Sequence, residues 1–171
     1  MVDAEASRAH LAGTLVLPSF FYAAIGGAVA VQIATSAVSI TDDRVWAPVR
    51  LAGVALFVLV AAVQLVRFRQ LNGVRLGGLA SRVVLGSATP AFISYALGLG
   101  ASAWAALNRM WWLAAVCAVA GGAAYALSGR RWWGRYRGDP ASHSRGESAG
   151  WIAILGAVAV AGLVLLVLWR R

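Results

Sequence analysis

Residues 110–137, MWWLAAVCAVAGGAAYALSGRRWWGRYR, join an uncharged apolar run to a cluster of arginines and aromatic side chains. Tryptophans stand at both ends of the run, and in a helix Trp112 and Trp132 would lie about 30 Å apart along the axis. That distance matches the hydrocarbon core of a bilayer, whose two interfaces are enriched in tryptophan. The stretch therefore predicts a transmembrane helix over residues 110–127, followed by a basic loop.

The composition extends this interpretation to the whole chain. Of its 171 residues, 61% are hydrophobic and 12% are charged, whereas soluble domains carry about 45–50% apolar and about 25% charged residues. This is too little charge to cover a water-facing surface, so lipid must cover the apolar side chains. We therefore predict an all-α, polytopic membrane bundle in which residues 1–171 form a single membrane-embedded domain.

Five stretches are long and apolar enough to cross a bilayer as helices, which takes about 20 residues each. The predicted spans are residues 15–40, 46–66, 89–108, 110–127 and 151–169. Thr89 and Pro90 suit the start of the third span, as a capping residue followed by proline. The first stretch could instead be a cleaved signal peptide, but its apolar run is too long and its leader is acidic.

The arginines predict the orientation. All 15 basic residues are arginine, and most of them lie in two predicted loops, residues 67–88 and 128–150. Because cytoplasmic loops are enriched in basic residues, we expect these loops and the N-terminus inside the cell and the C-terminus outside. The absence of lysine, with abundant alanine, glycine and valine, is typical of GC-rich bacterial genomes. The predicted location is therefore a bacterial cell (inner) membrane.

The basic cluster after the fourth span is the most distinctive polar feature. The residues assigned there to anionic-lipid or partner contact are Arg130, Arg131, Trp132, Trp133, Arg135 and Arg137. Each basic residue near an anionic leaflet contributes about 1 kcal/mol, and guanidinium groups bind phosphate bidentately. The plainest interpretation is a topology anchor with an aromatic belt. The alternatives are specific binding of anionic headgroups and docking of a partner, whereas nucleic acid is not expected against a bilayer.

Polar groups deep in the spans predict either helix packing or a polar lining. Gln32 and Ser36 lie in the first span and Gln64 in the second. A buried amide in lipid must find a partner, and interhelical hydrogen bonds of this kind contribute about 0.6 kcal/mol on average. Contacts between helices are therefore the simpler interpretation, and a substrate path is the alternative.

Small residues recur every four positions in the fourth span, at Ala114, Ala118 and Gly122, and again in the first span at Gly26 and Ala30. This spacing lets helix backbones approach closely. We expect packing inside one chain, with homodimerisation as the alternative.

Groups that could carry chemistry are scarce. No Asp, Glu, Lys, Arg or His lies in the middle of a predicted span, which argues against proton-coupled or cation-coupled transport through this chain alone. Cys117 is the single cysteine, and His10 and His143 lie outside the spans. We therefore expect no catalytic residues, no metal and no cofactor.

The leading functional hypothesis is a non-enzymatic accessory, assembly or regulatory subunit of a membrane complex. Its expected contacts are the bilayer, anionic headgroups on the cytoplasmic face, and another membrane protein or a second copy of itself. The alternative is a homo-oligomeric small-molecule transporter or channel, whose path would be lined by Gln32, Ser36, Gln64, Ser94 and Tyr95.

Overall fold

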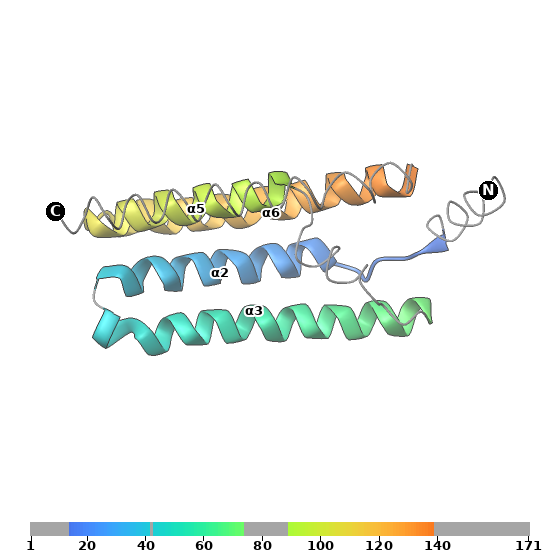
Figure 1. Ribbon diagram of the computed structural model, residues 1–171, viewed down its shortest axis with the longest axis horizontal. Coiled ribbons are helices and arrows are strands. Elements are labelled where there is room, and N and C mark those ends of the chain that lie inside the picture. The colour runs from blue at the N-terminus through green and yellow to red at the C-terminus, as the bar shows by residue number, and fades with distance from the viewer. Residues whose placement is uncertain (1–13, 42, 74–88, 139–171) are drawn as a thin grey trace.

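The fold is known from a computed structural model that describes residues 14–41, 43–73 and 89–138. Within these ranges the chain forms four α helices, α2 (Phe21–Thr41), α3 (Asp43–Asn72), α5 (Thr89–Leu107) and α6 (Trp111–Gly138) (Figure 1). All four contain an apolar stretch long enough to cross a membrane. The prediction of an all-α, polytopic membrane protein is therefore confirmed, and the predicted fifth span, residues 151–169, lies outside the described residues.

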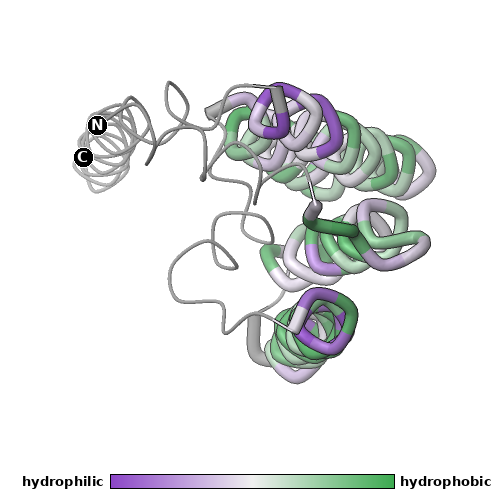
Figure 2. The backbone as a smooth tube through the Cα atoms, turned by 90° about the vertical axis from the view of Figure 1, so that its right-hand side faces the viewer, coloured by the Kyte–Doolittle hydropathy of each residue, from purple (hydrophilic) through white to green (hydrophobic). Residues whose placement is uncertain are grey.

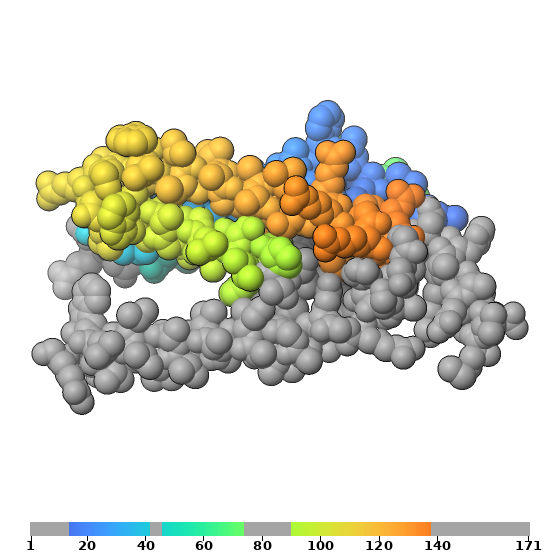
Figure 3. Space-filling model, turned by 90° about the horizontal axis from the view of Figure 1, so that it is seen from above, coloured from blue at the N-terminus to red at the C-terminus, as the bar shows by residue number. Residues whose placement is uncertain are grey.

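The helices run alternately in opposite directions, and α2 occupies the centre (Figure 1). α2 packs against α3, α5 and α6, while α5 and α6 pack against each other and form one face of the molecule (Figure 3). α3 packs mainly against α2 and lies at the edge of the described bundle (Figure 2). α2 therefore holds the described helices together.

Two helices continue beyond the ends predicted for their spans, into the predicted basic loops of residues 67–88 and 128–150. α3 ends at Asn72 and α6 at Gly138. Hydropathy marks where the lipid ends, but a helix satisfies its own backbone hydrogen bonds and can continue into water. Leucine, arginine and glutamine also have high helix propensity. α3 stops before Gly73, which has a φ of 63° and donates its N–H to the Arg69 carbonyl at 2.9 Å.

The turn between α5 and α6 has the Schellman geometry of a helix end. The N–H of Met110 donates to the Ala105 carbonyl and that of Arg109 to the Ala106 carbonyl, both at 2.9 Å. Arg109 takes the left-handed conformation, with a φ of 59°, at the position where glycine is usual. Met110 packs against the buried cluster that contains Ala105 and Ala106, so this hairpin closes tightly and sets α5 beside α6.

A glycine pair on α6 lets two other helices approach it closely. A Cβ atom on Gly122 would fall against the Gly26 carbonyl oxygen of α2 and 2.7 Å from the Cβ of Ala30. A Cβ atom on Gly121 would lie 2.9 Å from the Cα of Gly98 in α5. At such approaches dispersion and weak Cα–H···O contacts between backbones contribute to helix association.

The segment before α2 is tied to the end of α3. The Asn72 side-chain amide donates to the Val16 carbonyl and accepts from the Val16 N–H, both at 2.8 Å. It also donates to the Phe68 carbonyl at 2.9 Å, which caps α3. Leu15 and Leu17 pack against the core on either side of this link. The predicted first span therefore begins with an extended segment, and its helix starts only at Phe21.

Gly26 and Gly27 provide a matched test of the close contact. In Gly26→Ala the new methyl group meets the Cβ of Ala126 at 2.7 Å and the Gly122 carbonyl oxygen at 2.8 Å, whereas at Gly27 it meets nothing within 4 Å. We expect Gly26→Ala to lower the free energy of unfolding by about 1–3 kcal/mol, the usual cost of overpacking.

Gly27→Ala should leave the free energy of unfolding unchanged or raise it by up to about 1 kcal/mol, because alanine favours the helix. Reversible unfolding in mixed micelles, followed by circular dichroism, measures both variants. Equal losses at the two positions would show that the backbones do not touch at Gly26.

Candidate functional site: the cationic end of the bundle

The arginine cluster lies on the last turns of α6, at the end of the bundle where α3 also terminates (Figure 1). Hydrophilic residues gather at this end of both helices (Figure 2). The side chains of Arg130, Arg131, Arg135 and Arg137 are exposed. Arg67 and Arg69 of α3 add two more exposed guanidinium groups at the same end. The described arginines are thus concentrated where α3 and α6 leave the membrane.

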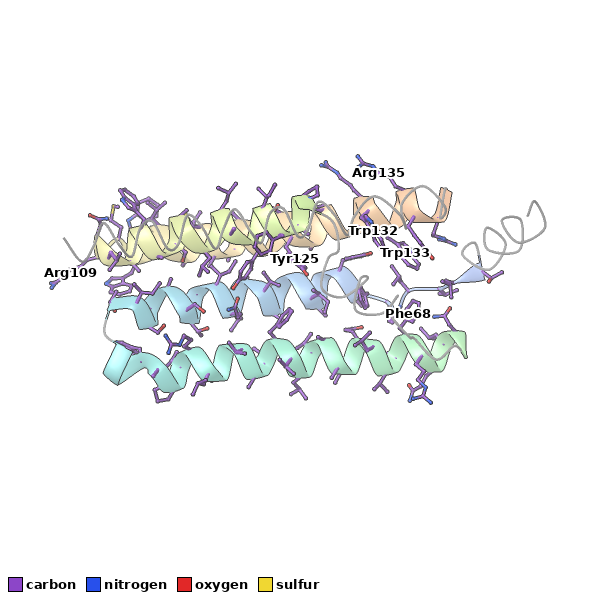
Figure 4. All side chains as sticks on the ribbon, in the orientation of Figure 1. Phe68, Arg109, Tyr125, Trp132, Trp133 and Arg135 are labelled. Carbon is purple, nitrogen blue, oxygen red and sulfur yellow. The ribbon has the colours of Figure 1, made fainter. Side chains whose placement is uncertain are left out.

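The helical structure separates the arginines of the cluster from its aromatic rings. At 100° per residue the four arginines share one side of α6, and Trp132, Trp133 and Tyr136 share the opposite side. Figure 4 shows Arg135 directed away from the bundle, while Trp132 and Trp133 are directed towards its interior. One face of this helix end is therefore cationic, and the other is part of the core.

The aromatic face attaches α6 to the end of α3. Trp133 meets Phe68 edge to face, with ring centroids 6.3 Å apart and planes at 86°. Tyr136 stacks on Trp132 and Trp133, with centroids 5.3 and 5.9 Å apart. Such pairs contribute about 0.5–1.5 kcal/mol each beyond the area they bury. The arginines are consequently carried by a helix end whose opposite face is packed against Phe68 of α3.

Burial changes the role of the two tryptophans. Trp132 and Trp133 are only 7% and 6% exposed, whereas Trp111 and Trp112 at the opposite end of α6 are 48% and 70% exposed. An indole group that contacts headgroups must be accessible, so neither of these buried tryptophans is placed for such a contact. The two tryptophans hold the helix end in place. The spacing of the tryptophans did not reveal this, because it carries no information on which neighbours cover each ring.

The described side chains around this end are cationic or neutral. Among the residues whose side chains are described, 14–41, 46–73 and 90–137, none is Asp or Glu. Arg131 and Arg135 are one turn apart, and like charges at this spacing destabilise a helix by about 0.2–0.5 kcal/mol. An anion on this face would relieve that repulsion. Phosphate suits guanidinium groups because it accepts paired hydrogen bonds.

The residues predicted as a polar lining are divided among different surroundings. The Gln32 side chain donates to the Ser36 hydroxyl of the same helix at 3.2 Å, and the Ser94 hydroxyl donates to the Pro90 carbonyl at 2.7 Å. Gln64 is buried, and its carbonyl oxygen has no hydrogen-bond partner among the described residues. Gln32 and Tyr95 line the same cavity between the helices.

The predicted small residues lie in contacts within this chain. Gly122 lies against Gly26 and Ala30, and Ala114 and Ala118 are buried. The Ala114 carbonyl also accepts a hydrogen bond of 2.9 Å from Ser102, a buried residue of α5. Sequence reasoning missed Ser102 because a lone serine in an alanine-rich span gives no signal. It also missed the clamp made by Asn72, although an asparagine before a glycine at a helix end is a recognisable cue.

No three His, Cys, Asp or Glu residues in the described ranges stand close enough to hold a metal ion. A scan against protein-family models finds no matching family, and searches of curated proteins and of solved structures find no match. The site is therefore argued from its own chemistry. Fold and hydropathy together define a multi-pass α-helical membrane protein with a cationic, aromatic-anchored end.

Replacing the four arginines of α6 by glutamine should weaken retention of an anionic lipid by at least about tenfold, because each charge near such a leaflet contributes about 1 kcal/mol. Arg109→Gln is the control, since this exposed residue lies at the opposite end of α6 (Figure 4). Native mass spectrometry with phosphatidylglycerol and phosphatidylcholine in competition measures the preference. If Arg109→Gln reduced the preference for phosphatidylglycerol as much as each of the four substitutions does on average, the result would contradict a site on the last turns of α6.

Proposed function

We propose that this chain is a non-enzymatic accessory subunit of a membrane complex and that the cationic end of α6 contacts its partner. The observation that carries the proposal is the exposed arginine face on a helix, held on the bundle by the pair of Phe68 and Trp133. A surface that is already ordered loses less conformational entropy when it binds. It therefore suits docking of an acidic partner or of anionic headgroups beside that partner.

The length of α6 supports the same proposal. Its 28 residues extend about 42 Å, whereas the hydrocarbon core of a bilayer is about 30 Å thick. The last turns therefore extend beyond the hydrocarbon, where a neighbouring protein can reach them. The deep polar groups of the described spans are amides and hydroxyls such as Gln32, Gln64 and Ser102, which are suited to packing and binding.

Photo-crosslinking in the native membrane tests the accessory role. A benzophenone amino acid replaces Gly134, an exposed position between the arginines where a Cβ atom meets nothing within 4 Å. We expect a discrete protein adduct that disappears when the four neighbouring arginines are changed to glutamine. The same probe at Leu97, which is exposed on α5, should not give that adduct. Adducts with lipid alone at position 134 would contradict the proposal.

We also propose that the arginine-rich end faces the cytoplasm of a bacterial cell, with the N-terminus inside and the C-terminus outside. The enrichment of basic residues on the cytoplasmic side supports this orientation, because Arg67, Arg69 and the four arginines of α6 share one end. In a Cys117→Ala background, Gly134→Cys should react with an impermeant maleimide only after lysis. Asn108→Cys, an exposed position at the other end, should react in intact spheroplasts. The reverse pattern would invert the topology.

Transport by a homo-oligomer is the second candidate function. The observation in its favour is the cavity that Gln32 and Tyr95 share. In the crosslinking experiment, an adduct between two copies of this chain would favour this candidate over the accessory role.

A further inference from the structure

A cavity of about 220 Å³ lies between the four described helices, near the middle of α2 and α3. Its walls are mainly apolar and aromatic, with Phe57 from α3, Phe92 from α5 and the ring of Tyr125 from α6. Gln32 of α2 and Tyr95 of α5 add polar groups. Each helix contributes to the lining, so the cavity exists only in the assembled bundle.

The two polar groups have unused hydrogen-bonding capacity. Gln32 donates from its side-chain nitrogen to Ser36 at 3.2 Å, and no described residue donates to its carbonyl oxygen. The Tyr95 hydroxyl likewise forms no hydrogen bond with any residue in the described ranges. At membrane depth water is scarce, so an unsatisfied polar group is costly. Gln32 and Tyr95 thus bring one acceptor and one hydroxyl to the lining of the cavity.

We infer that this cavity binds a neutral amphipathic alcohol or phenol with a ring body of about two fused rings. A ligand hydroxyl is both donor and acceptor, so it complements the carbonyl oxygen of Gln32 and the hydroxyl of Tyr95. The lining contains no charged side chain, which favours an uncharged ligand. Benzene fits an engineered apolar cavity of about 150 Å³, so the larger volume here accommodates a bicyclic molecule.

The ligand can enter from the lipid between α3 and α5. These two helices barely touch, since α3 packs mainly against α2. An amphipathic alcohol concentrates in the bilayer, so it reaches this gap without crossing water. Ser36, Gln64 and Ser94 do not line the cavity. The inference concerns binding in this one cavity, and it does not depend on the accessory role proposed above.

Fluorine NMR of the full chain in nanodiscs tests the inference, with 4-fluoro-1-naphthol as the probe and 1-fluoronaphthalene as the matched hydrocarbon. We expect the wild-type chain to bind the naphthol about tenfold more tightly than the hydrocarbon, as two modest hydrogen bonds allow. The double variant Gln32→Leu, Tyr95→Phe should lose this preference and still bind the hydrocarbon. Retained hydrocarbon binding shows that the cavity has survived the substitutions.

A second pair of variants tests the location. Val54 lines the cavity, so Val54→Phe should fill it and weaken binding of both probes. Val63 is exposed elsewhere on α3, so Val63→Phe should change neither. Equal binding of the two probes by the wild-type chain would overturn the inference. So would a double variant that still prefers the naphthol, or naphthol binding that is unchanged in Val54→Phe.

Discussion

The contact of Gly121 and Gly122 with α2 and α5 is the constraint on which the described bundle depends. Lipid tails are as apolar as the helices, so burial from water cannot drive helix against helix, and close backbone packing must do so. Gly122 meets Gly26 on α2, Gly121 meets Gly98 on α5, and the Ile33 side chain lies beside the second pair. This junction sets the rotation of three helices. It therefore determines which side chains face the cavity and which face of α6 lies against Phe68.

The four described spans could be predicted because lipid imposes a simple rule of length and apolarity. The helix ends could not, because α3 and α6 continue after hydropathy falls, to Asn72 and Gly138. Charge stops a chain from entering lipid, but it does not stop a helix that forms its own hydrogen bonds. The segment before Phe21 shows the opposite case, since it is apolar and yet extended. The Asn72 side chain holds this segment through hydrogen bonds to Val16. No local sequence pattern predicts hydrogen bonds between residues so far apart in the chain.

For the candidate sites as well, local properties could be predicted from the sequence, and contacts between helices could not. The sequence identified the arginines on α6, because their density is a local property. It could not separate them from Trp132 and Trp133, which are buried in a cluster that includes Phe68 of α3. The deep polar residues were also recognised, but their grouping depends on how α2 and α5 are rotated. Only the folded chain shows that Gln32 and Tyr95 share a cavity, and that Ser94 is hydrogen-bonded within its own helix.

The extension of α6 arranges its arginines in two tiers. Arg130 and Arg137 lie on one face of the helix, and seven residues of rise separate them by about 10 Å. This is about the Debye length at 0.1 M ionic strength. Where the membrane surface lies at the start of this cluster, Arg130 and Arg131 are nearer to the headgroups and Arg135 and Arg137 are nearer to the electrolyte. As salt is added, an anion bound at Arg135 and Arg137 should be released before one bound at Arg130 and Arg131. The same helix end can therefore respond to ionic strength in stages.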